Sequence, residues 1–319
     1  MTGKEQPTQS FLDQRCKLIF LGGKGGVGKS SLSAAIATYL SQQYKTLLIS
    51  TDPAHSLQDS FEATQFKEPT KPFAAIKNLD VWELDSHQAF NDFKQKHHKE
   101  LRLLFESSTY MDDDDIDELM TLMLPGIDEI MALKTITDII KDEKYDKLVI
   151  DTAPTGHALR LLLMPDTLNA WVKVMAGLRW KYREIHKTFK GKYHPDDADD
   201  LLMDLKRLVS RMKSYLSGDG LCEFIIATTP VKMAYQEALR FKDLLLSANI
   251  TTKHLIINKI APDSQDPFYH QLFTKQATSI DRISALFENF NILKVPMLNE
   301  EIIGIKNIEM VAKHLFSKN

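Results

Sequence analysis

Short apolar runs recur along the chain, and stretches with helical periodicity separate them. Several runs lack alternation with polar residues, which is typical of parallel strands covered on both faces. We predict strands at residues 17–21, 45–50, 79–84, 145–151, 223–229, 254–259 and 291–297. Strands that alternate with helices predict an α/β fold with a doubly wound, mostly parallel sheet, whose ligands bind at the carboxyl ends of the strands.

Two intervals are too long for a single crossover helix. Residues 86–142 and 157–216 each contain several helical patterns, so we predict one domain over residues 1–319 with a helical subdomain formed by these two insertions. Eight of the twelve methionines fall within residues 111–212, namely Met111, Met120, Met123, Met131, Met164, Met175, Met203 and Met212. Methionine fills irregular cores and also forms adaptable apolar binding surfaces, and the sequence leaves both interpretations open.

Composition excludes some classes of partner. The 319 residues carry a formal net charge of −3, which gives no general attraction to nucleic acid. The first fifteen residues lack the apolar core of a signal peptide, and no apolar run reaches roughly 18 residues. These features indicate a cytosolic protein. Cys16 and Cys222 are too few for a disulfide framework or a metal cage, and we expect both to be buried structural thiols.

The segment "LGGKGGVGKSS" (21–31) predicts a phosphate-binding loop. It fits the pattern Gly23-x-x-x-x-Gly28-Lys29-Ser30 between a predicted strand and a predicted helix, which is the context of a P-loop NTPase. In such a loop the backbone N–H groups and the helix N-terminus bind phosphate, the lysine reaches the β- and γ-phosphates, and the serine hydroxyl binds Mg²⁺. The expected ATP-binding residues here are Gly23, Lys24, Gly25, Gly26, Val27, Gly28, Lys29, Ser30 and Ser31.

Two aspartates end neighbouring predicted strands. Asp52 follows the strand at 45–50, where it faces the γ-phosphate and is a candidate to orient the attacking water. The alternative is that Asp52 only caps the next turn, and His55 is either a phosphate-facing residue or a loop histidine. Asp151 ends the strand at 145–151, the place of a carboxylate that holds Mg²⁺, partly through water. Ser30, Asp52 and Asp151 are therefore the expected metal ligands.

The base of the nucleotide is expected near the last strands. Asn258 ends a predicted strand, and its amide offers both a donor and an acceptor to a base edge. An asparagine after a strand is more often a turn residue, so this interpretation needs support. Pro296 and Met297 end the final strand and are candidates to pack on a purine.

Taken together, these motifs resemble those of the arsenite-pump and tail-anchored-protein-targeting ATPase family. The resemblance rests on "GGKGGVGKSS", "STDPAHSLQDSF", "PGIDE" (125–129), "DTAPTGHALRLL" and "VPMLNEEIIG", which run in family order from residue 17 to about 310. It implies a homodimer with two ATP molecules across the interface. Lys24 then matches the signature lysine that reaches the partner's nucleotide, Asp52 lies in switch I and activates water, and Asp151 begins switch II. The resemblance makes Asp52, Lys24 and Lys29 the catalytic candidates.

The resemblance also implies a partner. In the targeting branch, helices corresponding to the two methionine-rich insertions form a hydrophobic groove, spanning the dimer, for a client's transmembrane helix. The positions that match Asn258 and residues 296–298 line the adenine site. A membrane receptor and transient association with a membrane follow from the same branch.

Some positions depart from the family pattern. The Cys-x-x-Cys pair that binds zinc across the dimer in eukaryotic targeting ATPases has no counterpart here, so no zinc is expected. Cys16 and Cys222 do not supply the cysteine set that binds arsenite in pump ATPases. The chain has one phosphate loop, whereas pump ATPases are often two fused halves. Ile303 stands where the family usually has arginine.

Three functions remain as hypotheses. The leading one is a dimeric ATP-hydrolysing factor that binds the transmembrane segments of tail-anchored proteins and delivers them to a membrane. The second is an ATPase that drives an arsenite efflux pump. The third is a positioning ATPase of the partition or division type, which needs a membrane-binding tail or a basic DNA-binding face. The helices of 111–212 are alternatively only core, without an apolar client.

Overall fold

The computed structural model describes residues 10–52, 56–62, 72–108, 113–121, 126–152, 155–190, 194–217, 220–250 and 252–316. Its strands are β1 (Leu18–Gly23), β2 (Thr46–Ser50), β3 (Phe73–Ile76), β4 (Leu79–Glu83), β5 (Lys147–Asp151), β6 (Cys222–Thr228), β7 (Thr252–Ile260) and β8 (Asn291–Pro296). Its α-helices are α1 (Lys29–Leu40), α2 (Ser56–Phe61), α3 (Ser86–Lys96), α4 (His98–Ser108), α5 (Asp113–Thr121), α6 (Ile127–Lys141), α7 (Thr155–Lys190), α8 (Asp197–Ser217), α9 (Lys232–Ser247), α10 (Pro267–Leu286) and α11 (Ile305–Phe316). A 3₁₀ turn, η1, covers Ser10–Leu12.

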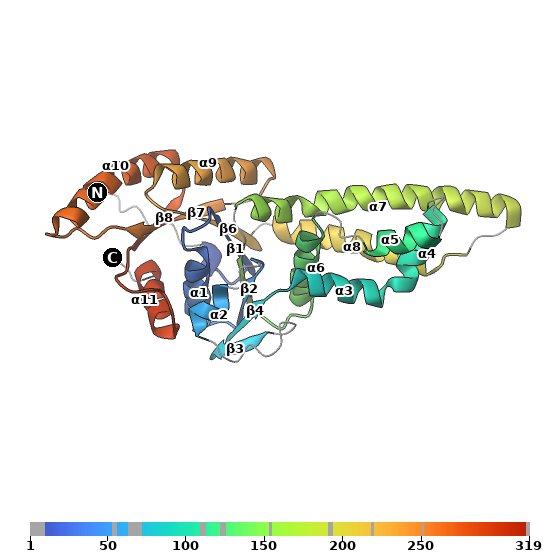
Figure 1. Cartoon of the computed structure of the whole chain (residues 1–319), viewed down its shortest axis with the longest axis horizontal. Coiled ribbons are helices and arrows are strands. Elements are labelled where there is room, and N and C mark those ends of the chain that lie inside the picture. The colour runs from blue at the N-terminus through green and yellow to red at the C-terminus, as the bar shows by residue number, and fades with distance from the viewer. Residues whose placement is uncertain are drawn as a thin grey trace. The chain divides into compact units, whose positions relative to one another are not determined.

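Within these described residues, eight strands form one sheet in the order β3-β4-β2-β5-β1-β6-β7-β8 (Figure 1). Every neighbouring pair is parallel except β3 and β4, which form an antiparallel hairpin. The seven strands expected from the apolar runs correspond to all of these strands but β3, so the α/β fold and the mostly parallel sheet are confirmed. Parallel neighbours place the carboxyl ends of β1, β2 and β5 together at one edge of the sheet.

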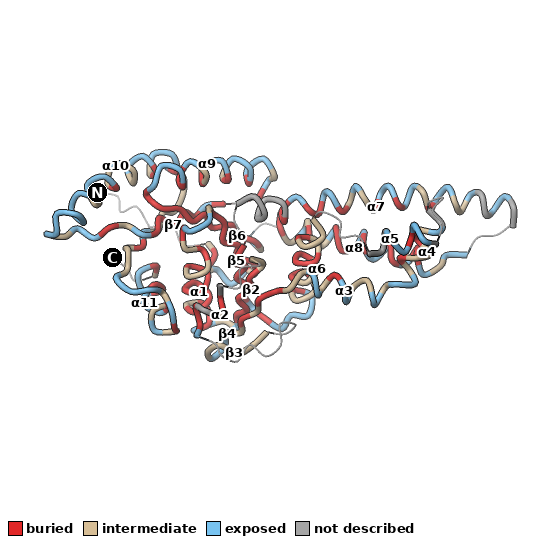
Figure 2. The backbone as a smooth tube through the Cα atoms, in the orientation of Figure 1, coloured by how far each residue is buried: buried red, intermediate tan, exposed pale blue. Residues whose placement is uncertain are grey.

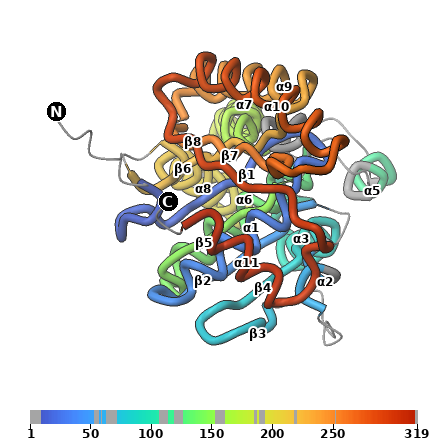
Figure 3. The backbone as a smooth tube through the Cα atoms, turned by 90° about the vertical axis from the view of Figure 1, so that its left-hand side faces the viewer, coloured from blue at the N-terminus to red at the C-terminus, as the bar shows by residue number. Residues whose placement is uncertain are grey.

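Helices cover both faces of this sheet. α1, α2 and α11 lie on one face, and α9 and α10 lie on the other (Figures 1 and 3). The strands β1, β2, β5 and β6 are buried along their whole length, as the red tubes of Figure 2 show. Burial on both faces explains why their sequences are continuous apolar runs rather than alternating ones.

The described part of the chain divides into two compact units. Unit 1 comprises residues 1–85, 142–159 and 215–319 and contains the sheet. Unit 2 comprises residues 86–141 and 160–214 and contains the helices α3 to α6 with most of α7 and α8. The chain passes from unit 1 to unit 2 within α7, a few residues after β5 ends. Across the described helices, none is long and apolar enough to cross a membrane.

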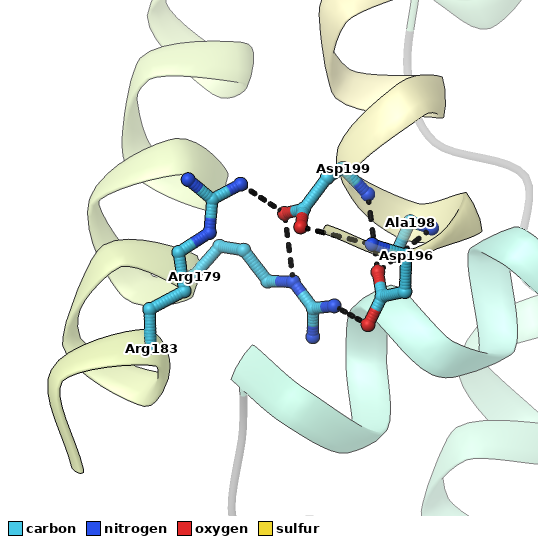
Figure 4. Close-up of polar contacts among 5 residues, drawn as sticks. All are labelled: Arg179, Arg183, Asp196, Ala198 and Asp199. Carbon is cyan, nitrogen blue, oxygen red and sulfur yellow. Dashed lines mark hydrogen bonds and ion pairs between the residues drawn. The ribbon is translucent and has the colours of Figure 1, made fainter. Parts of the chain in front are cut away.

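A buried arginine joins two helices within unit 2. The Arg179 side chain of α7 is 1% exposed, and its guanidinium is paired with Asp196 and, at 3.1 Å from Nε to Oδ1, with Asp199 (Figure 4). Arg183, one turn further along α7, pairs with the same Asp199. Asp196 also accepts hydrogen bonds from the backbone N–H groups of Ala198 and Asp199, so one carboxylate serves both the start of α8 and the guanidinium. Charges buried in this way require a partner, so removal of either aspartate would leave an uncompensated buried charge.

Methionine fills the core of this unit at several positions. Met131, Met164, Met175 and Met212 are buried, whereas Met203 of α8 is 48% exposed. The side chains of Met111, Met120 and Met123 lie outside the described residues. At the four buried positions the core-filling interpretation of methionine therefore holds.

The segment before β1 packs against residues at the amino-terminal ends of the strands β5 and β7. Phe11 is fully buried and packs edge-on against His254, with 4.8 Å between ring centroids. The Lys147 ammonium at the start of β5 donates to the backbone oxygens of Asp13 and Cys16. Burial lowers the pKa of Lys147 and raises that of the Cys16 thiol to about 12. Both cysteines are buried and free, as expected of structural thiols.

Candidate functional site

The predicted phosphate loop connects β1 to α1. At two of its glycines, neighbouring atoms lie too close for a side chain. Gly28 has φ +93°, and a Cβ there would lie 2.5 Å from Asn258 Nδ2. At Gly23 a Cβ would lie 2.3 Å from the backbone oxygen of Ala227 in β6. Side chains at these positions would force the loop away from the sheet. Gly25 and Gly26 are exposed at the loop tip, whereas Val27 is buried.

Lys29 places its ammonium among carboxylates at the base of the loop. The residue is 7% exposed, and Nζ donates to the backbone oxygen of Lys24 at 3.4 Å. Burial lowers the pKa of Lys29, and the charges of Asp151, Asp52 and Glu237, in that order, oppose the decrease. Asp151 ends β5, Asp52 follows β2, and Lys29 begins the helix after β1, so the order of these parallel neighbours places the three residues at the same end of the sheet.

Asp151 is a fully buried carboxyl at the end of β5. Its Oδ1 accepts a hydrogen bond from Ser33 Oγ at 3.3 Å, and the Ser30 hydroxyl also bonds this carboxyl. Among the described residues, Oδ2 has no hydrogen-bond partner. Burial raises the pKa of Asp151 to about 6, and the hydrogen bond from Ser30 and the charge of Lys29 oppose the increase. A buried carboxylate oxygen without a partner is costly unless a ligand binds it.

The available donors fit a magnesium ion. Ser30 supplies a hydroxyl and Asp52 and Asp151 supply carboxylates, so the set consists of oxygen atoms, which Mg²⁺ prefers. The unsatisfied Oδ2 of Asp151 is the observation that argues for a cation here. Magnesium also keeps water ligands and binds with few carboxylates.

The segment that carries Asp52 is anchored on both sides. The Asp52 backbone N–H donates to Ser50 Oγ at 3.2 Å. On the other side, the N–H groups of Leu57 and Gln58, in the first turn of α2, donate to Glu83 Oε1 at 2.9 and 3.0 Å. Glu83 ends β4 in register with Ser50 of β2 and is buried. A carboxylate that accepts the free N–H groups of a helix start stabilises that start.

Glu83 was not identified from the sequence. The clue that the sequence offers is that Glu83 stands between the apolar residues Trp82 and Leu84 in the run "LDVWEL". His55, and residues 153 and 154 of the "TAPTGH" segment, lie outside the described residues. The side chain of His157 is also outside them.

Lys24 is paired within its own chain. Its Nζ lies 3.9 Å from Glu237 Oε2 of α9, and each side chain is about one-third exposed (34% and 33%). Glu237 carries no signal in the sequence, because it is an ordinary glutamate in an amphipathic helix. The structure thus brings a carboxylate from α9 next to the loop lysine Lys24.

The expected base-binding residues end two neighbouring strands. Asn258 is buried near the end of β7, and its Nδ2 donates to the backbone oxygen of Val27 at 2.9 Å. Pro296 ends β8 opposite Ile260, and the Met297 N–H donates to Ile260 O at 2.7 Å. Asn258 therefore contacts the phosphate loop directly, whereas Pro296 and Met297 lie at the end of the next strand.

The comparison with known proteins covers almost the whole chain. The model of the anion-transporting ATPase family matches residues 16–317. Similar relatives include "ATPase GET3" of Scheffersomyces stipitis, 28% identical over 98% of this chain and 94% of the relative. "ATPase GET3A" of Arabidopsis thaliana is 30% identical over 96% of this chain and 85% of its own. "Putative arsenical pump-driving ATPase 2" of Aquifex aeolicus is 30% identical over 94% of this chain and 99% of its own. Because the match runs from before β1 to the end of α11, and so includes every strand that builds the phosphate site, this chain belongs to the anion-transporting ATPase family and is an ATPase of that family.

Proposed function

We propose that the protein is a dimeric, ATP-hydrolysing targeting factor that binds apolar transmembrane segments of tail-anchored proteins in the cytosol. It hands them to a membrane through a receptor. The observation that carries the ATPase part is the glycine-rich loop between β1 and α1, with the buried Lys29 after it and the buried Asp151 at the end of the neighbouring strand β5. ATP is the expected nucleotide, because the family is one of ATPases.

Each site residue has a role in this proposal. The N–H groups of residues 24–31 and the start of α1 bind the phosphates, and the Lys29 ammonium offsets the charge of the β- and γ-phosphates. Ser30, Asp52 and Asp151 hold Mg²⁺, which neutralises charge that develops on the phosphate oxygens. Asp52 accepts a hydrogen bond from the attacking water and orients it toward the γ-phosphate.

Lys24 acts across the dimer in this proposal. A lysine that only binds phosphate within its own chain would duplicate Lys29, whereas a lysine at the loop entrance can reach a second nucleotide. In the single chain Lys24 is held by Glu237, so pairing of two chains must exchange this contact for one with the partner's nucleotide. The pair is partly exposed and therefore weak, so the exchange costs little.

Exposed apolar residues in unit 2 support an apolar client. Leu163, Val174 and Trp180 of α7 and Met203 of α8 are between 42% and 61% exposed. In the proposed function these side chains are the points at which an apolar client would be contacted. α7 starts at Thr155, a few residues after Asp151, and most of its residues belong to unit 2.

An arsenite-pump role is the second candidate, because one relative is named a putative arsenical pump-driving ATPase. The thiols argue against activation by arsenite. Burial raises the pKa of Cys16 to about 12 and that of Cys222 well above its ordinary value, so both stay protonated at neutral pH. A metalloid requires accessible thiolates. Docking on a membrane pump needs no thiol and stays open to test.

Co-expression with a single-span, C-terminally anchored membrane protein tests the proposal. We expect a soluble complex that forms with ATP and is lost on hydrolysis. The double substitution of Val174 and Trp180 by serine should reduce recovery of the complex and leave ATPase activity unchanged. The matched control is the substitution by serine of the exposed Val231, which precedes α9, and Met233, in its first turn; this variant should retain the complex.

Failure to recover any ATP-sensitive complex would remove the targeting role. ATPase activity that rises with arsenite would favour the pump role instead. ATP-dependent sedimentation with liposomes or DNA, without a client, would indicate a positioning ATPase.

A further inference from the structure

The end of β7 departs from regular strand geometry beside the phosphate loop. The register between β7 and β8 shifts between Ile257 and Ile260. Within this irregular stretch Lys259 has φ +60°, in the left-handed region that non-glycine residues rarely adopt. Such a conformation persists only where surrounding contacts enforce it, and it is often found at functional sites.

Specific side chains enforce it here. The Lys259 N–H donates to Asn258 Oδ1 at 2.9 Å. Gln276 of α10 is 7% exposed and bonds the backbone on both sides of Ile260. Its Nε2 donates to Lys259 O at 3.4 Å, and its Oε1 accepts from the Ala261 N–H at 2.7 Å. These contacts satisfy the backbone groups that the irregular strand removes from the sheet.

The turn directs two donors at the phosphate loop. Asn258 Nδ2 donates to the backbone oxygen of Val27, and Lys259 Nζ donates to the backbone oxygen of Gly26, each at 2.9 Å. Two consecutive loop carbonyls are therefore held toward β7. Position 28 must be a glycine for the loop to lie this close, since a Cβ there would overlap the Asn258 amide.

Because the peptide unit is planar, the two bonded carbonyls also fix the direction of the N–H groups that follow them in the loop. In a planar trans peptide the C=O of one residue and the N–H of the next point in opposite directions. Holding the carbonyls of Gly26 and Val27 toward β7 therefore turns the N–H groups of Val27 and Gly28 away from it. The Val27 N–H indeed points at Lys24 O, the oxygen that also accepts from the Lys29 ammonium. The Val27 N–H and the Lys29 ammonium thus converge on one carbonyl, which an incoming phosphate oxygen would replace as their acceptor.

We propose that Lys259 is a positioning residue which, together with Asn258, holds the phosphate loop in its binding conformation before nucleotide arrives. The inference rests on the proposed function of the loop as the phosphate site. A loop whose carbonyls are already held on the β7 side needs less reorganisation to bind an anion, and the gain applies equally to ATP and ADP because both carry phosphates that the loop N–H groups bind. Lys259 itself touches no reacting atom in this role.

The test uses Lys259→Met in the full chain, with Lys259→Arg as the conservative variant. Loss of this exposed, charge-assisted hydrogen bond should raise the KM for ATP and the Kd for ADP roughly 5- to 20-fold. Turnover at saturating ATP should change less than about twofold, because the lost interaction stabilises substrate and transition state equally. Lys259→Arg should restore most of the affinity.

Lys253→Met is the matched control. Lys253 is an exposed lysine at the other end of β7, and its removal should leave KM unchanged. An unchanged KM in Lys259→Met, or an equal increase in Lys253→Met, overturns the inference, as does a fall in turnover with KM unchanged. The proposed function is judged separately: wild-type protein that binds no ATP, or Lys29→Ala that binds it normally, would reject the phosphate site itself.

Discussion

Replacing Asp151 with asparagine should stabilise the protein in the absence of nucleotide and metal. The carboxyl is completely buried, and its Oδ2 lacks a hydrogen-bond partner among the described residues. Burial raises its pKa from the ordinary 3.8 to about 6. One pKa unit corresponds to about 1.4 kcal/mol, so ionised Asp151 lowers the free energy of unfolding by about 3 kcal/mol.

The pH dependence follows from the sign of this shift. Between about pH 4 and pH 6 the folded chain keeps the Asp151 proton while the unfolded chain has released it. The contribution of this group is therefore fully present below pH 4 and is lost as pH rises through 6. Asparagine at this position cannot ionise, so the variant should gain stability over wild type across this range and keep a constant advantage above it.

Urea denaturation in EDTA, repeated at half-unit steps from about pH 4.5 to 7.5, measures the difference. Asp243→Asn removes an exposed carboxylate of α9 and is the control, for which we expect no such trend. Saturating Mg²⁺ and ATP should then reverse the order, because the carboxylate gains a cation that asparagine binds poorly. A difference that stays flat between about pH 4.5 and 6.5, or that shrinks as pH rises, would refute the reasoning.

Three further predictions concern the loop and its neighbours. Asp52→Asn should retain ATP binding and reduce turnover by roughly 10²-fold or more, and unchanged single-turnover rates would remove Asp52 from the mechanism. Lys24→Ala should slow hydrolysis only where chains can pair, and full activity of this variant across a concentration series would contradict the role across the dimer. Glu237→Gln should raise the activity at low protein concentration and change the free energy of unfolding by less than roughly 0.5 kcal/mol. Gly28→Ala should lower the free energy of unfolding by about 1–2 kcal/mol, because an alanine strains at φ +93° and meets Asn258, and should abolish nucleotide binding; binding in an equilibrium dialysis assay would show that the loop tolerates a shift.

The sheet was predictable because its strands are buried on both faces. A run such as "KLVID" has three consecutive apolar residues at its centre instead of an alternation with polar ones, which distinguishes it from the amphipathic helices around it. β3 escaped prediction for the opposite reason. It is four residues long, contains two alanines, lies at the edge of the sheet and is only partly buried, so its sequence has neither an apolar run nor a clear alternation.

Only those residues of the phosphate site that lie close together in the sequence were predictable. Gly23, Gly28 and Lys29 function through the strand–loop–helix in which they lie, so their spacing is informative. Glu83 and Glu237 join the site through pairing of β4 with β2 and packing of α9, and neither residue stands in a motif. For Asn258 the sequence offered a base contact or a turn, and the structure shows a donor to Val27 that neither interpretation included.

The strand order has a consequence for how the chain is made. β1 carries the phosphate loop, yet its two neighbours in the sheet are β5 and β6, which follow much later in the sequence. During synthesis, β1 has no neighbour until residues 147–151 have left the ribosome, and the loop has no support from Asn258 until β7 follows. Pairings between segments so distant form slowly and leave apolar strands exposed in the meantime. We therefore expect the nucleotide site to mature last, with ATP acting on the nascent protein as a ligand that completes folding.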